Sequence, residues 1–146
     1  MAKNFYRIHS THFLIQPGED EKIINEGMYG LALSSFLQQK LRGLGYQVPF
    51  FLAEDWGWWV EIKGLPFRCG LCIYAGKLDP SINAPSQWVI YRDTPAKTRI
   101  WSWRRLKYLE ISSEVARLDQ NLRAVFQSDP HIKLIEITSE MPELDL

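Results

Sequence analysis

Over residues 56–75 the chain reads WGWWVEIKGLPFRCGLCIYA. Two stretches that alternate in polarity, residues 56–63 and 67–75, flank the tripeptide Gly64-Leu65-Pro66. Successive side chains of a β-strand point to opposite faces, and glycine and proline are typical of turns. The pattern therefore predicts an antiparallel hairpin with one apolar face. That face is expected to carry Trp56, Trp58, Val60, Ile62, Phe67, Cys69, Leu71, Ile73 and Ala75.

Two helices are predicted on either side of this hairpin. The first spans about residues 25–44, where leucines and a phenylalanine share one face and Gly45 is suited to end the helix. The second has apolar residues three and four positions apart and ends at Ser128, before Asp129-Pro130. Ser112 or Ser113 is expected to cap its start, and an earlier start near Arg104 stays open.

Further strands are predicted over residues 5–15, 46–52, 87–93 and 131–137, and a loop over residues 79–86. The element order is then strand, helix, three or four strands, helix and strand. This order predicts an α+β fold, with an antiparallel or mixed twisted sheet of about five to six strands and two helices packed on one face. The length of 146 residues fits a single domain, residues 1–146.

The sheet face opposite the helices is the predicted binding surface. By the alternation it carries Trp59, Glu61, Arg68, Tyr74 and Tyr91. A tryptophan exposed on a sheet is often covered by a partner, although an ordinary amphipathic surface is the competing interpretation. An exposed Trp59 on this face is equally compatible with a homodimer and with binding of a different protein.

Composition narrows the function classes. Seventeen basic and seventeen acidic residues cancel, which argues against a broad positive field for nucleic acid. Aromatic residues make up 13% of the chain, six of them tryptophans, and fit a dense core or a binding surface. The chain has no catalytic triad signature and no glycine-rich phosphate loop, so neither an enzyme nor a cofactor is predicted. No signal peptide or membrane span is predicted, and the two cysteines favour a reducing cytoplasm.

Two cysteines and two histidines have matching spacings. Cys69 and Cys72 form a C-x-x-C pair, and His9 and His12 lie equally far apart. Four such ligands would suffice for a tetrahedral zinc site. However, the cysteines lie in an alternating strand and point to opposite faces, so no metal is predicted, and zinc through these four residues is a minor alternative.

Glu54 and Asp55 precede the hairpin and are candidate binding residues. Two adjacent carboxylates do not flank a glycosidic bond at the separation that hydrolysis needs. They are instead expected to accept hydrogen bonds from indole N–H groups or arginines. Gly57 is expected to permit a close approach of backbone or ring.

Residues 97–107 read KTRIWSWRRLK and combine five basic residues with Trp101 and Trp103. Aromatic platforms between basic side chains hold single-stranded nucleic acid, which makes such binding through Lys97–Lys107 an alternative function. Because the chain is neutral overall, the favoured interpretation places both tryptophans in the core and the basic side chains in water.

A family resemblance rests on Leu44-Gly45-Tyr46 at a helix end, Glu54-Asp55-Trp56-Gly57-Trp58, and the strand beginning Gln87-Trp88. In these motifs the chain resembles small bacterial proteins of unassigned function, similar in size and style to immunity proteins that bind and block a toxin. The resemblance implies a non-catalytic protein that binds another protein, and it carries over no catalytic residue. The alternative is a small-molecule sensor in which an aromatic pocket and a buried carboxylate hold a lipophilic cation.

Overall fold

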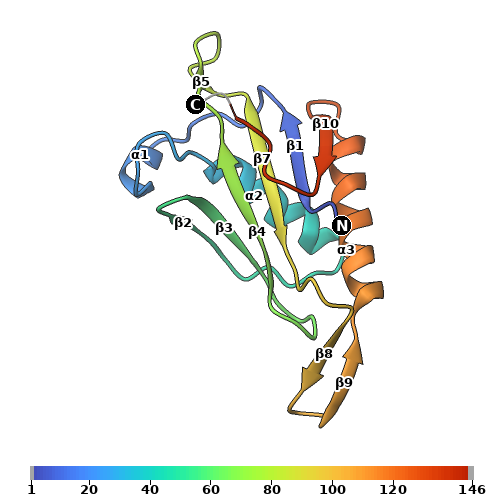
Figure 1. The fold of residues 1–146 in the computed structure, drawn as a ribbon. Coiled ribbons are helices and arrows are strands. Elements are labelled where there is room, and N and C mark those ends of the chain that lie inside the picture. The colour runs from blue at the N-terminus through green and yellow to red at the C-terminus, as the bar shows by residue number, and fades with distance from the viewer. Residues whose placement is uncertain (1, 145–146) are drawn as a thin grey trace.

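The computed structural model describes residues 2–144, and Met1, Asp145 and Leu146 lie outside it. Its six main strands are β1 (Phe5–His9), β2 (Phe51–Glu54), β3 (Gly57–Ile62), β4 (Cys69–Ala75), β7 (Gln87–Asp93) and β10 (Lys133–Thr138). They form one sheet in the order β10-β1-β7-β4-β3-β2, with every neighbouring pair antiparallel. Helices α2 (Leu31–Gly43) and α3 (Ser112–Ser128) pack on one face of this sheet (Figure 1). The predicted α+β class is confirmed.

The hairpin predicted from the alternating pattern is β3–β4. Its cross-strand pairs Trp58–Ile73 and Val60–Leu71 are buried against the helices. Trp56 does not join them, so its predicted place in the core is wrong. The two-residue turn between β2 and β3 takes Trp56 out of the alternation, and its half-buried ring lies 5.5 Å from that of Tyr74.

Helix α3 follows the predicted apolar face and ends at Ser128, before Asp129-Pro130. Its buried residues are Leu118, Leu122, Val125 and Phe126. The predicted serine cap is wrong, because the chain enters the helix from a β-strand and Ile111 is the N-cap residue. The Ser112 hydroxyl instead donates to the Glu110 carboxylate at 2.8 Å.

The first helix is shorter than predicted. The chain forms a short helix α1 (Glu19–Lys22), and α2 begins only at Leu31. Gly30 is the N-cap residue of α2 and has no side chain to accept a hydrogen bond. The buried carboxylate of Glu19 accepts from the backbone N–H groups of Gly30 and Leu31, at 2.8 and 3.0 Å, and from that of Gln16 at 2.9 Å. A residue eleven positions upstream therefore caps α2.

Two small hairpins lie outside the main sheet. One of them, β5 (Leu78–Asp79) with β6 (Ala84–Pro85), overlaps the predicted loop over residues 79–86. The other, β8 (Arg99–Ser102) with β9 (Lys107–Glu110), occupies the segment where an earlier start of α3 stayed open. Figure 1 shows it projecting from the start of α3, away from the sheet. We call this hairpin, residues 99–110, the arm.

A polar chain joins the sheet to α3. The hydroxyl of Tyr6 donates to Asp119 at 2.5 Å and accepts from the Nε of the buried Arg92 at 3.1 Å. Asp119 also pairs with Arg123, at 3.0 Å. Burial and the Asp119 hydrogen bond raise the pKa of Tyr6 above its ordinary value. Because Tyr6 is completely buried, this group is part of the packing between sheet and helix.

No helix within residues 2–144 combines the length and the apolar character that crossing a bilayer requires.

Candidate functional site

The sheet face opposite the helices carries a row of aromatic side chains. The strand register places Trp59 beside Cys72, Cys72 beside Tyr91, and Tyr91 beside Phe5. The rings of Phe5 and Tyr91 stack with their centroids 4.6 Å apart. Tyr74 lies on the same face as this row, next to Trp56. The structure thus brings three of the predicted binding residues, Trp59, Tyr74 and Tyr91, onto one surface.

Trp59 lies flat on this surface. A side chain at Gly70 would overlap its indole ring, so the ring rests directly on the backbone of β4. The indole N–H donates to Glu61 at 2.5 Å, and Glu61 pairs with Lys63 at 3.2 Å. Trp59 is consequently half-buried and held in place, and Glu61 positions it.

The other predicted binding residues lie at the margins. Arg68 is exposed immediately before β4, Glu54 is half-buried at the end of β2, and Asp55 is exposed in the following turn. The expected hydrogen bonds from the neighbouring indoles to these two carboxylates do not form. The indole of Trp58 donates to the carbonyl of Met28 at 2.8 Å, and that of Trp59 to Glu61.

Part of this face is covered. Val89 alternates with the core residues Trp88 and Ile90 and so points away from the helices, yet it is 0% exposed. Figure 1 shows the segment that follows β10 running back across the strands on this side. The accessible aromatic surface therefore lies over β3 and β4, where Trp59 and Tyr74 are.

The cysteines and histidines do not meet. Cys69 faces the helices and Cys72 the opposite side, and within residues 2–144 no group of three or more His, Cys, Asp or Glu side chains is arranged to hold a metal ion. His12 instead stacks on His131, with ring centroids 3.7 Å apart. Burial raises the pKa of both thiols to about 12, which disfavours the thiolate that zinc binding and redox chemistry need.

These raised values predict a loss of stability in alkali. A thiol whose pKa is higher in the folded than in the unfolded chain stabilises the fold fully below the unfolded value of 9.0, and this contribution is lost as the pH rises toward 12. The ionisation of each cysteine in the unfolded chain should make the free energy of unfolding at about pH 10 lower than at about pH 8, by about 1.4 kcal/mol per cysteine. Urea unfolding of the wild type, Cys69→Ala and Cys72→Ala at pH 8 and 10 measures this. Equal pH dependence in all three proteins would contradict the prediction.

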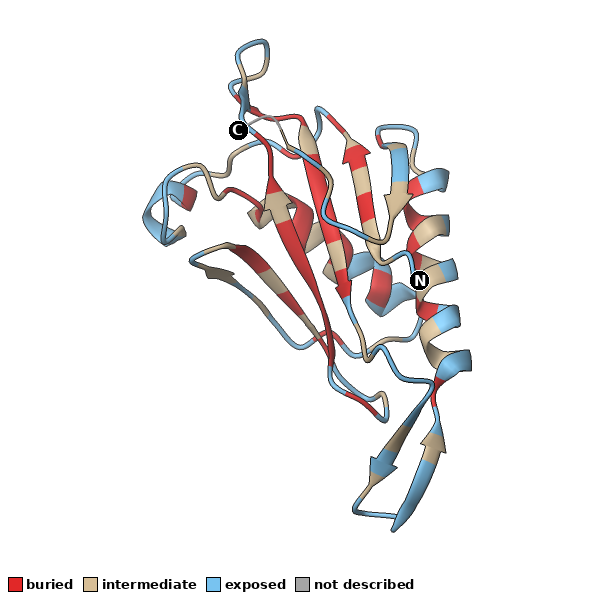
Figure 2. Cartoon of the chain, in the orientation of Figure 1, coloured by how far each residue is buried: buried red, intermediate tan, exposed pale blue. Residues whose placement is uncertain are grey.

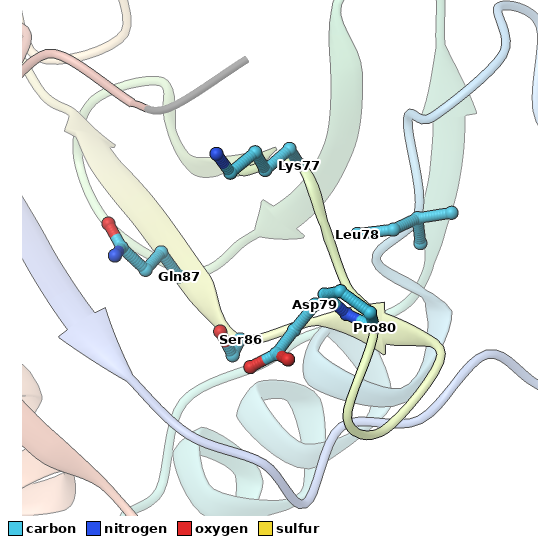
Figure 3. A pocket seen from close by; sticks show the side chains of 6 residues that line it. All are labelled: Lys77, Leu78, Asp79, Pro80, Ser86 and Gln87. Carbon is cyan, nitrogen blue, oxygen red and sulfur yellow. The ribbon is translucent and has the colours of Figure 1, made fainter.

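Three hollows of the surface lack the aromatic lining of the predicted pocket, whereas two others are lined in part by Tyr46. Figure 3 shows one beside β5 and β6, with a volume of about 260 Å³, in which Lys77 and Leu78 point in different directions. Asp79 also lines it, accepts hydrogen bonds from Ser81 and points toward Ser86. The hollow in Figure 3 and two larger ones, of about 580 and 550 Å³, are lined by no aromatic side chain.

The arm carries a second and more exposed aromatic cluster. Trp103 is 79% exposed and Trp101 41%, so the favoured interpretation of both as core residues is wrong. The Trp101 ring lies 5.8 Å from that of Trp103 and 5.1 Å from that of Tyr108, at steep angles to both. The guanidinium of Arg99 lies 5.2 Å from the centre of the Tyr108 ring. Figure 2 shows the arm as almost entirely exposed or intermediate in burial.

The base of the arm is anchored in the core. Ile100 and Leu109 form a cross-strand pair that packs against the core, and Ile111 just beyond is fully buried. Because side chains alternate along a strand, Trp101 and Tyr108 point to the other side. The packing of the aliphatic pair against the core therefore places the aromatic face of the arm in water.

Comparison of the chain with models of protein families, with curated proteins and with solved structures finds no match. The site is therefore interpreted from its geometry. The basic and aromatic composition of residues 97–107 already indicated a possible binding segment in the sequence. Its exposure could not be predicted, because it depends on how the base of the arm packs.

Proposed function

We propose that this chain is a non-catalytic bacterial protein of the cytoplasm that acts by binding another protein, with the arm as its contact surface. The exposure of Trp103, next to Trp101 and Tyr108, carries the proposal. Leaving an indole in water is unfavourable, and a rigid aromatic cluster flanked by arginines is typical of the residues that dominate protein interfaces.

The positions of the polar groups support a binding role. The buried ionisable groups Tyr6, Glu19 and Arg92 are engaged in hydrogen bonds that hold the fold together. The hollow in Figure 3 places Ser86 near Asp79 and Lys77, and its lining contains no histidine or cysteine. An immunity-like role, in which the arm binds and blocks a toxin, is the specific form of the proposal that the sequence resemblance suggests.

The double substitution Trp101→Ala/Trp103→Ala tests the proposal. We expect it to weaken binding of the partner more than tenfold, because it removes the exposed ring surface of the arm, and to leave the melting temperature nearly unchanged. The measurement is affinity purification of tagged wild-type and variant protein from the native host, followed by titration of the protein that co-purifies.

Two variants serve as controls. Ile24→Ala removes a 59% exposed aliphatic side chain far from the arm along the chain and should leave binding unchanged. Trp59→Ala removes an accessible ring of the open sheet face. If Trp59→Ala weakens binding and the arm variant does not, the contact surface is the sheet face and the proposal for the arm is wrong.

A further inference from the structure

We infer that the partner presents an acidic segment of polypeptide to the arm. This inference rests on the proposed function and specifies the chemistry of the partner. The arm would place its rings against the apolar parts of that segment and its arginines against the carboxylates. Three features of the structure support this choice: the distribution of charge, the position of two arginines, and the surroundings of those arginines.

The charge of the chain is strongly separated. The arm, residues 99–110, contains four basic residues and one acidic residue, Glu110. The remaining thirteen basic and sixteen acidic residues give the rest of the chain a formal net charge of −3. A neutral protein thus carries a compact positive projection on an acidic body, and the projection attracts an acidic partner at close range.

Two arginines border a cleft next to the arm. Arg104 and Arg105 in the turn of the arm, together with Leu65 and Pro66 of the β3–β4 turn, line a space of about 580 Å³. An arginine fork binds a carboxylate through two parallel hydrogen bonds. In the cleft, the N–H groups of the arginines can therefore donate to a carboxylate, and apolar side chains lie beside them. This combination suits an acidic side chain on an extended peptide.

The same cleft disfavours a nucleic acid. Glu110 and Glu114 line it beside the two arginines, so carboxylates interrupt the positive charge of the cleft. Proteins that hold single strands surround their aromatic platforms with a continuous positive groove, whereas the body of this chain is acidic. Pairing of two arms from two copies is opposed by the net positive charge of each, which has four basic residues and one acidic residue.

Charge-matched probes test the inference directly. We expect a labelled oligo-L-glutamate to bind the full-length protein by fluorescence anisotropy, and its affinity to fall as salt rises from about 0.05 to about 0.5 M. Arg104→Glu/Arg105→Glu should lower the affinity at low salt about tenfold. Lys77→Glu/Lys133→Glu makes the same change of net charge outside the arm and should have little effect. Arm-dependent binding of an oligothymidylate of equal charge that exceeds binding of the oligoglutamate would overturn the inference in favour of nucleic acid.

The partner obtained from the host separates failure of this inference from failure of the proposed function. If Trp101→Ala/Trp103→Ala abolishes its binding and Arg104→Glu/Arg105→Glu does not, the arm is the contact surface but the partner is not held by its acidic groups. If neither variant affects binding, the proposed function of the arm fails as well. Concentration-dependent self-association in sedimentation that the tryptophan variant abolishes would identify a second copy as the occupant and overturn the inference.

Discussion

Replacing Gly57 by alanine is expected to lower the free energy of unfolding by about 4 kcal/mol. Gly57 opens β3 with φ = +154°, a backbone angle that residues with a side chain rarely adopt. A methyl group there would also overlap the carbonyl oxygen of Ile73 on β4. The strand can relieve this overlap only by moving away from β4, which breaks the pairing at the start of the hairpin.

Gly45→Ala is the matched control. Gly45 also has a positive φ, +95°, but the methyl group would have no neighbouring heavy atom within 4 Å. Gly45→Ala should therefore lower the free energy of unfolding only through backbone strain, by about 1 kcal/mol. Urea unfolding of the two variants separates strain from overlap. Equal losses would show that the contact with Ile73 is unimportant.

Glu19→Ala should have the next largest effect, a loss of about 3 kcal/mol. The carboxylate is 1% exposed and accepts three backbone hydrogen bonds. Its removal leaves the buried N–H group of Gly30 and the partly buried N–H groups of Leu31 and Gln16 without this acceptor, and it removes a negative charge from the N-terminus of α2. Faster amide hydrogen exchange at Gly30 and Leu31 should accompany the loss of stability.

Two further variants show whether the effect comes from capping. Glu21→Ala changes an exposed carboxylate of the same short helix and should alter stability by no more than about 0.5 kcal/mol. Glu19→Gln keeps one acceptor oxygen, and its free energy of unfolding should lie between those of the alanine variant and the wild type. A Glu19→Ala protein as stable as Glu21→Ala would contradict the capping role.

The regular elements could be predicted because their patterns are local. Alternation of side chains over residues 56–75 specifies which face of the hairpin is apolar, and the spacing of Leu118 and Leu122 specifies the inner face of α3. β7 also has the predicted bounds, Gln87–Asp93. In each case, neighbours two to four positions apart carry the information.

The candidate site was predicted less well. The open sheet face with Trp59, Tyr74 and Tyr91 follows from alternation, but its partial cover over Val89 does not. Trp56 was misplaced because a turn interrupts the alternation one residue before β3 begins. The tryptophans of the arm were misplaced because an overall charge of zero conceals a positive segment balanced by an acidic body.

The sequence by itself determined the α+β class, the hairpin and the amphipathic face of α3, since a periodic pattern needs only its own neighbours. The tertiary structure alone decided which carboxylate caps α2 and which aromatic residues stay in water. Glu19 reaches Gly30 because the chain folds back between them, and Trp101 is exposed because Ile100 and Leu109 pack against the core on the other side of the arm. Both the capping of α2 and the exposure of the arm depend on contacts between segments that are distant in the sequence, and local sequence patterns do not specify such contacts.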